Sequence, residues 1–226
     1  MKKTVALLLV LLMCLSAPLC GVASGSGAYK VGDTVTFGSW GGEPIEWQIM
    51  EVKENGICVL LSVKGLDAKP YNTERKDVTW ETCTLRAWLN SEFYETAFSA
   101  SEKGKIVLST VENPDNKEYG TKGGNTTKDY VYLLSLDEVG RYFRVDPYPY
   151  SYNYCRSDAL ICFPTATAKN NGASTDSAGA CWWWLRSPGN FRSDAASVGD
   201  FGYVYYVGDY VDCTDGCVRP VVCARL

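Results

Sequence analysis

The chain has 226 residues, of which 46% are hydrophobic and 21% charged, and its formal net charge is -4. This is ordinary globular composition with enough length for one sizeable core, and without a basic cluster it lacks the electrostatic footprint of a nucleic-acid-binding protein. The sequence contains no histidine, which excludes Ser-His-Asp and Cys-His nucleophiles, His-ligated zinc and the commonest general base.

Residues 1–24 have the three parts of a secretory signal peptide. Two lysines precede an apolar run from Val5 to Leu15, and small residues follow it. The run is too short for a typical membrane span. We therefore expect cleavage after Ala23, a secreted or cell-surface location, and no membrane span. An uncleaved anchor and lipidation at Cys20 are the alternatives.

The first half of the remaining chain begins with strands. Three runs have strand-like patterns, which are Thr34–Phe37, Ile45–Val52 and Ile57–Val63. Asn55-Gly56 between the last two runs is the strongest short signal for a hairpin turn. These runs predict an antiparallel entry to the fold.

Helical spacing follows. It extends from Thr82 to Ile106, and Ser99 and Glu102 within it form a capping box that starts a second short helix. A polar loop is expected over 113–128, a strand over 130–134, and a second capping box at Ser135 and Glu138 opens a helix toward Phe143. Because strands and helices segregate instead of alternating, residues 25–226 are predicted to form one α+β domain.

The segment after Cys181 differs from the rest of the chain. It begins with three tryptophans followed by Leu-Arg-Ser-Pro-Gly and ends with Gly-Cys-Val-Arg-Pro, with a Gly-, Asp- and Tyr-rich stretch between them. Because buried tryptophans contribute a large apolar area, Trp183 and Trp184 are expected to be core anchors. Arg186 and Arg219 are expected to be structural ion-pair partners.

The eight cysteines beyond the predicted leader can be interpreted in three ways. An even number in an exported chain indicates disulfides, although spacing does not give the connectivity. Free buried thiols are the second interpretation. The close set Cys213, Cys217 and Cys223 also resembles a soft-metal or redox cluster, which is the third.

Several of these motifs resemble an uncharacterised family of exported bacterial domains. The two boxes are Trp-Leu-Arg-Ser-Pro-Gly after Trp183 and Gly-Cys-Val-Arg-Pro from Gly216, and the motifs Pro44-Ile-Glu-Trp47 and Leu85–Asn90 also match. The family is similar to the C-type-lectin-like superfamily, which includes the variable proteins of diversity-generating retroelements and the formylglycine-generating oxidases. The resemblance implies a C-type-lectin-like fold with small antiparallel sheets, two or three helices and a long, loop-rich C-terminal β segment.

The resemblance also implies a variable or ligand-binding segment over residues 187–220. In the variable proteins, mutable positions alternate with fixed small or apolar ones, and Ala195, Ala196, Val198, Val204 and Val211 match the fixed positions. Lys, Glu, Gln, Met and Trp, which adenine-specific mutagenesis of an Asn codon does not produce, are absent from residue 187 onward. Ordinary selection on a Gly-, Asp- and Tyr-rich loop would give the same composition.

The expected ligand-binding residues combine rigid aromatic area with adaptable polar groups, as antibody paratopes do. They are Asn190, Phe191, Arg192, Asp194, Asp200, Phe201, Tyr203, Tyr205, Tyr206, Asp209, Tyr210 and Asp212. Alternation along a strand would also make about half of the tyrosines structural. A second aromatic cluster over residues 148–154 is interpreted either as packing or as part of a binding rim.

The sequence therefore predicts an exported, non-catalytic domain that binds a glycan or a surface protein, with no cofactor, no catalytic residue and no metal. One alternative is a copper- or thiol-dependent oxidase of the formylglycine-generating type, with Cys213 and Cys217 as the reactive pair. The other is a carboxylate-dependent hydrolase using two of the tail aspartates. The oligomeric state and any dependence on calcium stay open.

Overall fold

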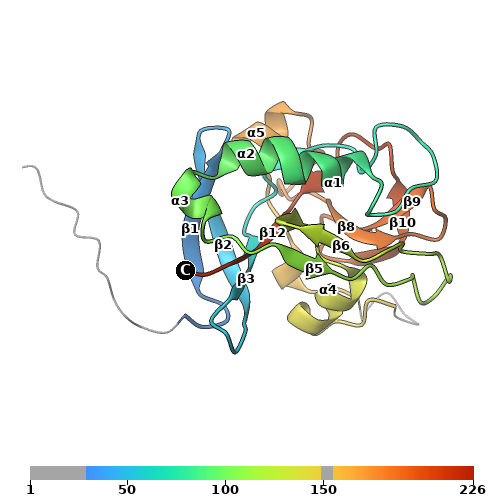
Figure 1. Cartoon of the computed structure of the whole chain (residues 1–226). Coiled ribbons are helices and arrows are strands. Elements are labelled where there is room, and N and C mark those ends of the chain that lie inside the picture. The colour runs from blue at the N-terminus through green and yellow to red at the C-terminus, as the bar shows by residue number, and fades with distance from the viewer. Residues whose placement is uncertain (1–28, 149–154) are drawn as a thin grey trace, which may run out of the picture.

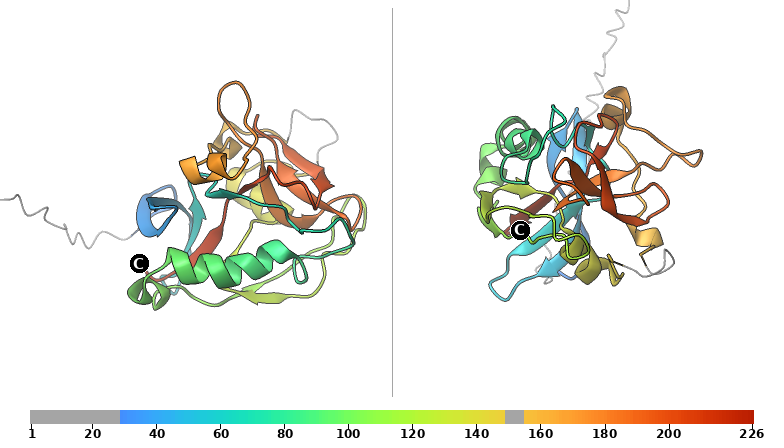
Figure 2. Two further views of the ribbon diagram at one scale, coloured as in Figure 1. Left: turned by 90° about the horizontal axis from the view of Figure 1, so that it is seen from above. Right: turned by 90° about the vertical axis from the view of Figure 1, so that its right-hand side faces the viewer.

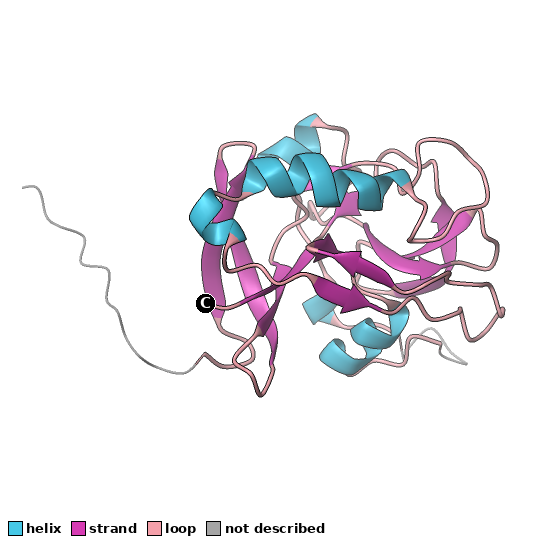
Figure 3. Cartoon of the chain, in the orientation of Figure 1, coloured by secondary structure: helices cyan, strands magenta, loops and turns pink. Residues whose placement is uncertain are grey.

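The computed structural model describes residues 29–148 and 155–226, in which short helices surround small sheets (Figure 1). This part of the chain is mixed α+β, with two five-stranded sheets and one two-stranded sheet (Figure 3). The predicted leader at 1–24 and most of the aromatic cluster expected at 148–154 lie outside the described residues.

The first sheet joins the two ends of the described chain. Its strands, in spatial order, are β1 (Thr34–Trp40), β2 (Glu43–Val52), β3 (Cys58–Ser62), β12 (Val221–Ala224) and β7 (Val131–Tyr132). The β2–β3 hairpin turns at Gly56, whose positive φ of 76° suits glycine, as the Asn-Gly signal predicts. The C-terminal strand β12 pairs with both β3 and β7. The C-terminal strand is therefore an inner strand of the sheet that begins with β1.

The second sheet holds the C-terminal segment. Its strands, in spatial order, are β10 (Val204–Tyr210), β9 (Asp194–Val198), β8 (Trp183–Pro188), β11 (Cys217–Val218) and β4 (Asp67–Ala68). Every residue of β8 and β9 is buried, whereas β10 at the sheet edge has mainly half-buried and exposed side chains. The two sheets occupy opposite ends of the molecule (Figure 2).

The helical segment expected from 82 to 106 is a rod of short pieces. These are α1 (Thr84–Trp88), a π-helical turn η1 (Leu89–Phe93), α2 (Tyr94–Ala97) and, after a break, α3 (Ala100–Lys103). Leu85, Leu89 and Phe93 are buried, and the Ser99–Glu102 capping box is present. The predicted capping box and the second short helix are thus confirmed, whereas the π-helical turn within the first helix was not predicted.

The other elements are short. They are β5 (Ser109–Val111), β6 (Thr127–Asp129), α4 (Leu136–Phe143), the 3-10 turn η3 (Asp158–Leu160) and α5 (Ala166–Asn170). The capping box of Ser135 and Glu138 opens α4 as predicted. The strand expected over 130–134 contains only the two residues of β7, and β6 interrupts the end of the expected loop. In Figure 1 the α1–α2 rod and α4 lie on opposite sides of the strands.

Trp183 and Trp184 are fully buried, which confirms their predicted place in the core. Their indole N–H groups donate to the carbonyl oxygens of Leu160 and Lys69, at 3.1 and 2.9 Å. A buried indole needs such a partner. Trp182 is only half-buried and packs edge-on against Trp184.

The two arginines of the boxes differ. Arg186 is buried, forms an ion pair with Glu138 and donates to the carbonyls of Leu133 and Glu112. Arg219 is also buried, but it pairs with no carboxylate among the described residues, and its Nε donates to the Ser62 carbonyl at 2.9 Å. The ion-pair prediction is therefore confirmed for Arg186 and wrong for Arg219.

The predictions about a membrane span and about disulfides can also be compared with the structure. Within residues 29–148 and 155–226, no helix has the length and apolar character needed to cross a membrane. The eight cysteines are unbridged thiols, and seven of them are buried. The structure is thus the thiol form of the chain, without the bridges that the sequence suggested.

Candidate ligand-binding surface

The apolar residues predicted as fixed positions of the C-terminal segment are buried. Ala195, Ala196 and Val198 of β9, Val204 of β10 and Val211 just after β10 pack in the core cluster. Strand β9 is buried on both faces, whereas most side chains of the edge strand β10 after Val204 are half-buried or exposed. The predicted fixed residues are therefore core residues, and the outward face belongs to β10 and the flanking loops.

The outward positions present large aromatic side chains. The exposed fractions are 65% for Phe191, 56% for Phe201, 40% for Tyr205 and 51% for Tyr210. Arg192 is also exposed, and the half-buried members of the predicted set are Asn190, Asp200, Tyr203, Tyr206, Asp209 and Asp212. Asp194 is the exception, because it is only 6% exposed. The structure thus brings eleven of the twelve predicted residues at least partly to the surface.

A bulge in β10 shapes the middle of this surface. The pairing of β9 with β10 shifts register between Tyr205 and Asp209. Gly208 within the bulge has a φ of 86°, and a Cβ there would lie 2.7 Å from the Ala195 carbonyl oxygen. Only glycine fits this close approach.

A side chain from a distant loop holds the bulge. The buried Asn116 amide donates to the carbonyls of Pro188 and Tyr206, at 3.0 and 2.8 Å. It therefore links the end of β8 to the bulge of β10. Sequence reasoning missed this residue because the region 113–128 was predicted only as a polar loop.

Further residues from outside the tail extend the surface. Tyr119, itself largely exposed, stacks on Tyr206 with ring centroids 5.9 Å apart, and Tyr148 contacts the same ring at 5.8 Å. Tyr206 is thus partly a packing residue, and Tyr148 takes the packing role considered for its cluster. Tyr119 continues the aromatic surface beyond the tail.

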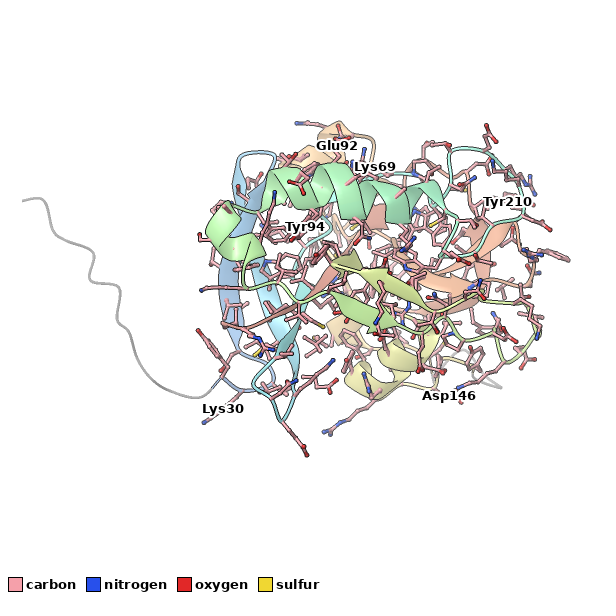
Figure 4. All side chains as sticks on the ribbon, viewed as in Figure 1. Lys30, Lys69, Glu92, Tyr94, Asp146 and Tyr210 are labelled. Carbon is pink, nitrogen blue, oxygen red and sulfur yellow. The ribbon has the colours of Figure 1, made fainter. Side chains whose placement is uncertain are left out.

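Two arginines contact tail aromatics. The Arg75 guanidinium lies 3.4 Å from the centre of the Tyr210 ring, which is a cation–π contact. Arg156 donates from Nε to the Phe201 carbonyl at 3.0 Å and lies 5.7 Å from the Tyr203 ring. Figure 4 shows Tyr210 projecting at the end of the molecule far from Lys30.

Two tail aspartates have raised pKa values. Burial raises the pKa of Asp209, although its carboxylate accepts a hydrogen bond from the Ser197 hydroxyl at 2.7 Å. Burial also raises the pKa of Asp194, with a smaller contribution from the negative charge of Asp209. Raised pKa values of neighbouring carboxylates are one mark of acid–base sites, and structural burial gives them equally well.

A shallow depression of about 450 Å³ adjoins the exposed end of the tail. It is lined by Asp77, by residues 119–122 and by residues 190–193. Its wall therefore contains Asn190, Phe191 and Arg192 from the predicted set. Aromatic, cationic and anionic groups all border it, as in a site for a polar ligand with an apolar face.

A larger cleft of about 670 Å³ lies away from the tail, between β2, β3, α4 and the segment of β5. Its prominent polar groups already have partners. The Tyr142 hydroxyl donates to Glu51 at 2.9 Å, and Arg186 is paired with Glu138. It contains no predicted site residue.

The alternative metal and thiol sites find little support. Within the described residues, no cluster of three or more cysteine, aspartate or glutamate side chains could hold a metal ion. The Cys217 thiol lies against Cys181, whereas the pKa of Cys213 is raised by burial and then by the carboxylates of Asp209, Asp215 and Asp212, with no cysteine among its causes. The structure therefore does not bring Cys213 and Cys217 together as a reactive pair.

Comparison with known proteins gives one match. Residues 55–225 match a family described as "Domain of unknown function (DUF6273)". The chain belongs to this family. No curated protein and no solved structure matches it. The match runs from just before β3 to the end of β12, so the whole second sheet and its aromatic surface are part of the DUF6273 domain.

Proposed function

We propose that this DUF6273 domain is an exported, non-catalytic ligand-binding domain with a C-type-lectin-like fold, and that residues 190–212 form its recognition surface. The supporting observation is the exposure of aromatic side chains beside a buried frame. Among the described residues, four of the ten exposed large hydrophobic side chains lie in this short segment, and all four are aromatic. They are distributed along the β9–β10 hairpin, from its tip near Phe201 to its other end at Tyr210. Exposed apolar side chains gathered in one segment favour an interaction site.

The chemistry of the surface favours a polar ligand with apolar faces. Aromatic rings provide rigid contact area at low entropic cost, and the half-buried Asp and Asn side chains around them provide hydrogen bonds. A glycan has both kinds of surface, and so does a folded protein. The ligand class is therefore a glycan or a protein exposed on a cell surface.

The same arrangement would tolerate diversification. Because the buried residues of β9 and Val204 of β10 carry the packing, the exposed side chains of β10 and of the loops beside it can change without emptying the core. We therefore propose that residues 187–220 are a variable segment. Sequencing the neighbouring DNA tests this proposal, with a near-repeat of this segment that differs at adenines, beside a reverse transcriptase, as the expected result. Absence of such a repeat from the complete genome would contradict diversification while leaving ligand binding open.

Binding itself is tested with labelled protein on arrays of glycans and of bacterial surface proteins. Phe201→Ala and Tyr210→Ala should weaken binding by about 1 to 3 kcal/mol at one or both positions, because interface energy concentrates in a few aromatic anchors. Phe163→Ala is the matched control, since Phe163 is 49% exposed but lies outside the tail. If all three variants bound as tightly as the wild-type chain, recognition would lie outside residues 190–212.

A carboxylate-dependent hydrolase is the second candidate, and the raised pKa values of Asp194 and Asp209 favour it. Against it, neither carboxylate lines the two hollows described above. Incubation of the array glycans with the protein separates the two functions. Cleavage that is lost in Asp209→Asn would support hydrolysis, and intact glycans would support binding alone.

A further inference from the structure

Three buried cysteines meet near the start of β8. Cys162 follows η3, Cys181 directly precedes β8, and Cys217 begins β11. Each is at most 1% exposed, and each comes from a different part of the sequence. The fold therefore places three thiols in one region of the core, away from the surface that we assign to the ligand.

The backbone places Cys162 and Cys181 opposite one another. They form an antiparallel β-bridge, and the Cys181 N–H donates to the Cys162 carbonyl at 2.8 Å. Residues paired in this way have Cα atoms about 5.5 Å apart and side chains on the same face of the sheet. A disulfide requires Cα atoms about 4.4 to 6.8 Å apart. The Cα spacing of the pair therefore falls within the disulfide range, and the hydrogen bond between the two thiols places the sulfurs next to one another.

Cys217 is the third sulfur of the group. The sulfurs of Cys181 and Cys217 lie 3.4 and 2.9 Å from the single point at which a Cβ on Gly65 would sit. Cys181 is thus flanked by one thiol on each side. Any side chain on Gly65 would displace the Cys217 sulfur, so glycine at this position preserves the group.

The adjacent Arg219 indicates which chemistry the group supports. Its guanidinium is buried 4.9 Å from the Trp183 ring, and its Nη1 has no hydrogen-bond partner among the described residues. Its positive charge acts on Cys162 and Cys181. A fixed cation beside the sulfurs disfavours a bound metal cation and favours the thiolate form that thiol–disulfide exchange needs.

Cys162 is held in its protonated form in the folded chain. The pKa of Cys162 is raised, first by its hydrogen bond to Cys181 and then by burial, and the opposing effect of Arg219 is smaller. Exchange therefore belongs to folding or to local opening, before the group is sealed in the core.

We propose that Cys162 and Cys181 form a disulfide when the chain folds in the presence of a small-molecule disulfide, and that Cys217 is the alternative partner of Cys181. The thiolate of one cysteine attacks the small disulfide, forming a mixed disulfide and releasing one small thiolate. The second cysteine then attacks the protein sulfur and releases the other. The two protons lost by the cysteines end on the two small thiols, so the oxidant is reduced as the protein pair is oxidised.

Exchange with the third thiol is balanced in the same way. Cys217 attacks the sulfur of Cys181, Cys162 leaves as a thiolate, and it takes the proton that Cys217 gives up. The Cys162–Cys181 bond would close a loop that carries α5 and the exposed Phe163, and would fix the start of β8. This proposal does not depend on whether the tail binds a ligand.

The test is a peptide map of the full chain, unfolded and refolded with reduced and oxidised glutathione, then alkylated and digested with trypsin. Cleavage after Arg156, Lys169 and Arg186 separates the two cysteines. We expect a linked pair of peptides, 157–169 with 170–186, and near-complete loss of alkylation at both thiols. Reduction before digestion should abolish the link.

Two variants sharpen the outcome. In Cys162→Ser the link should move to Cys181 and Cys217, joining peptides 170–186 and 193–225. Cys58→Ser is the matched control, because Cys58 is equally buried but no other thiol contributes to its pKa shift, which burial alone raises. The Cys58→Ser variant should retain the link between peptides 157–169 and 170–186. Full alkylation of Cys162 and Cys181 in the refolded wild-type chain would overturn the proposal. So would a predominant link between other cysteines, or tight binding of one copper(I) or zinc ion by these thiols.

Discussion

Trp183 and Tyr205 are aromatic neighbours in the second sheet with opposite environments. Trp183 is fully buried with its N–H satisfied, whereas Tyr205 is 40% exposed on the edge strand. The first therefore contributes to folding, and the second, under our proposal, to recognition.

This difference predicts separate effects on stability. Trp183→Ala should lower the free energy of unfolding by about 3 to 5 kcal/mol, because it empties a large core site. Tyr205→Ala should change it by less than about 1 kcal/mol, as is usual for exposed positions. Urea unfolding of both variants measures the difference. An equal loss of stability in both would mean that β10 is core and not surface.

Asp209 predicts a dependence of stability on pH. Burial raises its pKa in the folded chain above the ordinary value of 3.8, so folding favours the protonated form. The stabilisation is full below the unfolded pKa and is lost as the pH rises through the folded pKa. Asp209→Asn mimics the neutral form and keeps an acceptor for Ser197.

Thermal melting near neutral pH should therefore show a higher melting temperature for Asp209→Asn than for the wild-type chain. The gain should vanish below the ordinary Asp pKa. Asp200→Asn, in the same segment, is the control for removing one negative charge. A gain of the same size in both variants would indicate general charge repulsion instead of burial at Asp209.

At the level of single residues, the sequence predicted burial and exposure correctly where the local pattern of apolar and polar residues determines them. Val204 in β10 and Val211 just after it are buried as predicted, because apolar residues are drawn to the core. Asp194 was misplaced, since its burial depends on the close approach of Gly189, whose Cβ would lie 2.8 Å from that of Asp194. Asn116 and Arg75 were missed because contacts across such sequence distances leave no local pattern.

At the scale of elements, helix α4 is linked to the second sheet through one residue of its first turn, Glu138. Glu138 closes the capping box with Ser135 and also pairs with the buried Arg186. One carboxylate therefore satisfies a helix start and neutralises a buried cation. The two roles can be separated by substitution.

Ser135→Ala should cost about 1 kcal/mol of stability, which is typical for loss of an N-cap. Glu138→Gln can retain the cap but leaves Arg186 as a buried charge without a partner, so it should cost about 3 to 5 kcal/mol. Chemical denaturation of the two variants gives the comparison. If Glu138→Gln is no worse than Ser135→Ala, the ion pair contributes little beyond the cap.

Elements whose signals are local were predicted well. The Asn55-Gly56 turn and both capping boxes are formed within a few residues and appear where expected. The helical rod is divided by the π-helical turn η1, where Asn90 accepts hydrogen bonds from the backbone N–H groups of Tyr130 and Val131. That contact is tertiary, so helical periodicity alone does not predict the division.

On the scale of the whole molecule, the chain's first and last strands share one sheet, and the aromatic surface is built on the other. Lys30 and Tyr210 lie at opposite ends of the structure (Figure 4). The α+β class followed from the segregation of helices and strands. The sequence did not predict the pairing of β11 with both β8 and β4, because strands of two residues have no periodicity to recognise.

The contacts at the start of the described chain are relevant to the predicted cleavage after Ala23. The described fold begins with the turn in which the Lys30 N–H donates to Asp33 at 2.9 Å, and the Gly32 N–H donates to the Ile49 carbonyl at 2.8 Å. Cleavage after Ala23 would leave both contacts intact.

We therefore predict that exported protein begins near Ser24 and keeps the stability of the full chain. Mass spectrometry of the secreted form locates the N-terminus, and thermal melting compares a chain starting at Ser24 with the complete one. Equal melting temperatures are expected because the contacts that tie down the first strand begin at Lys30. Recovery of exported protein that retains Met1 would mean that the leader is an anchor, and a lower melting temperature would mean that it contributes to the fold.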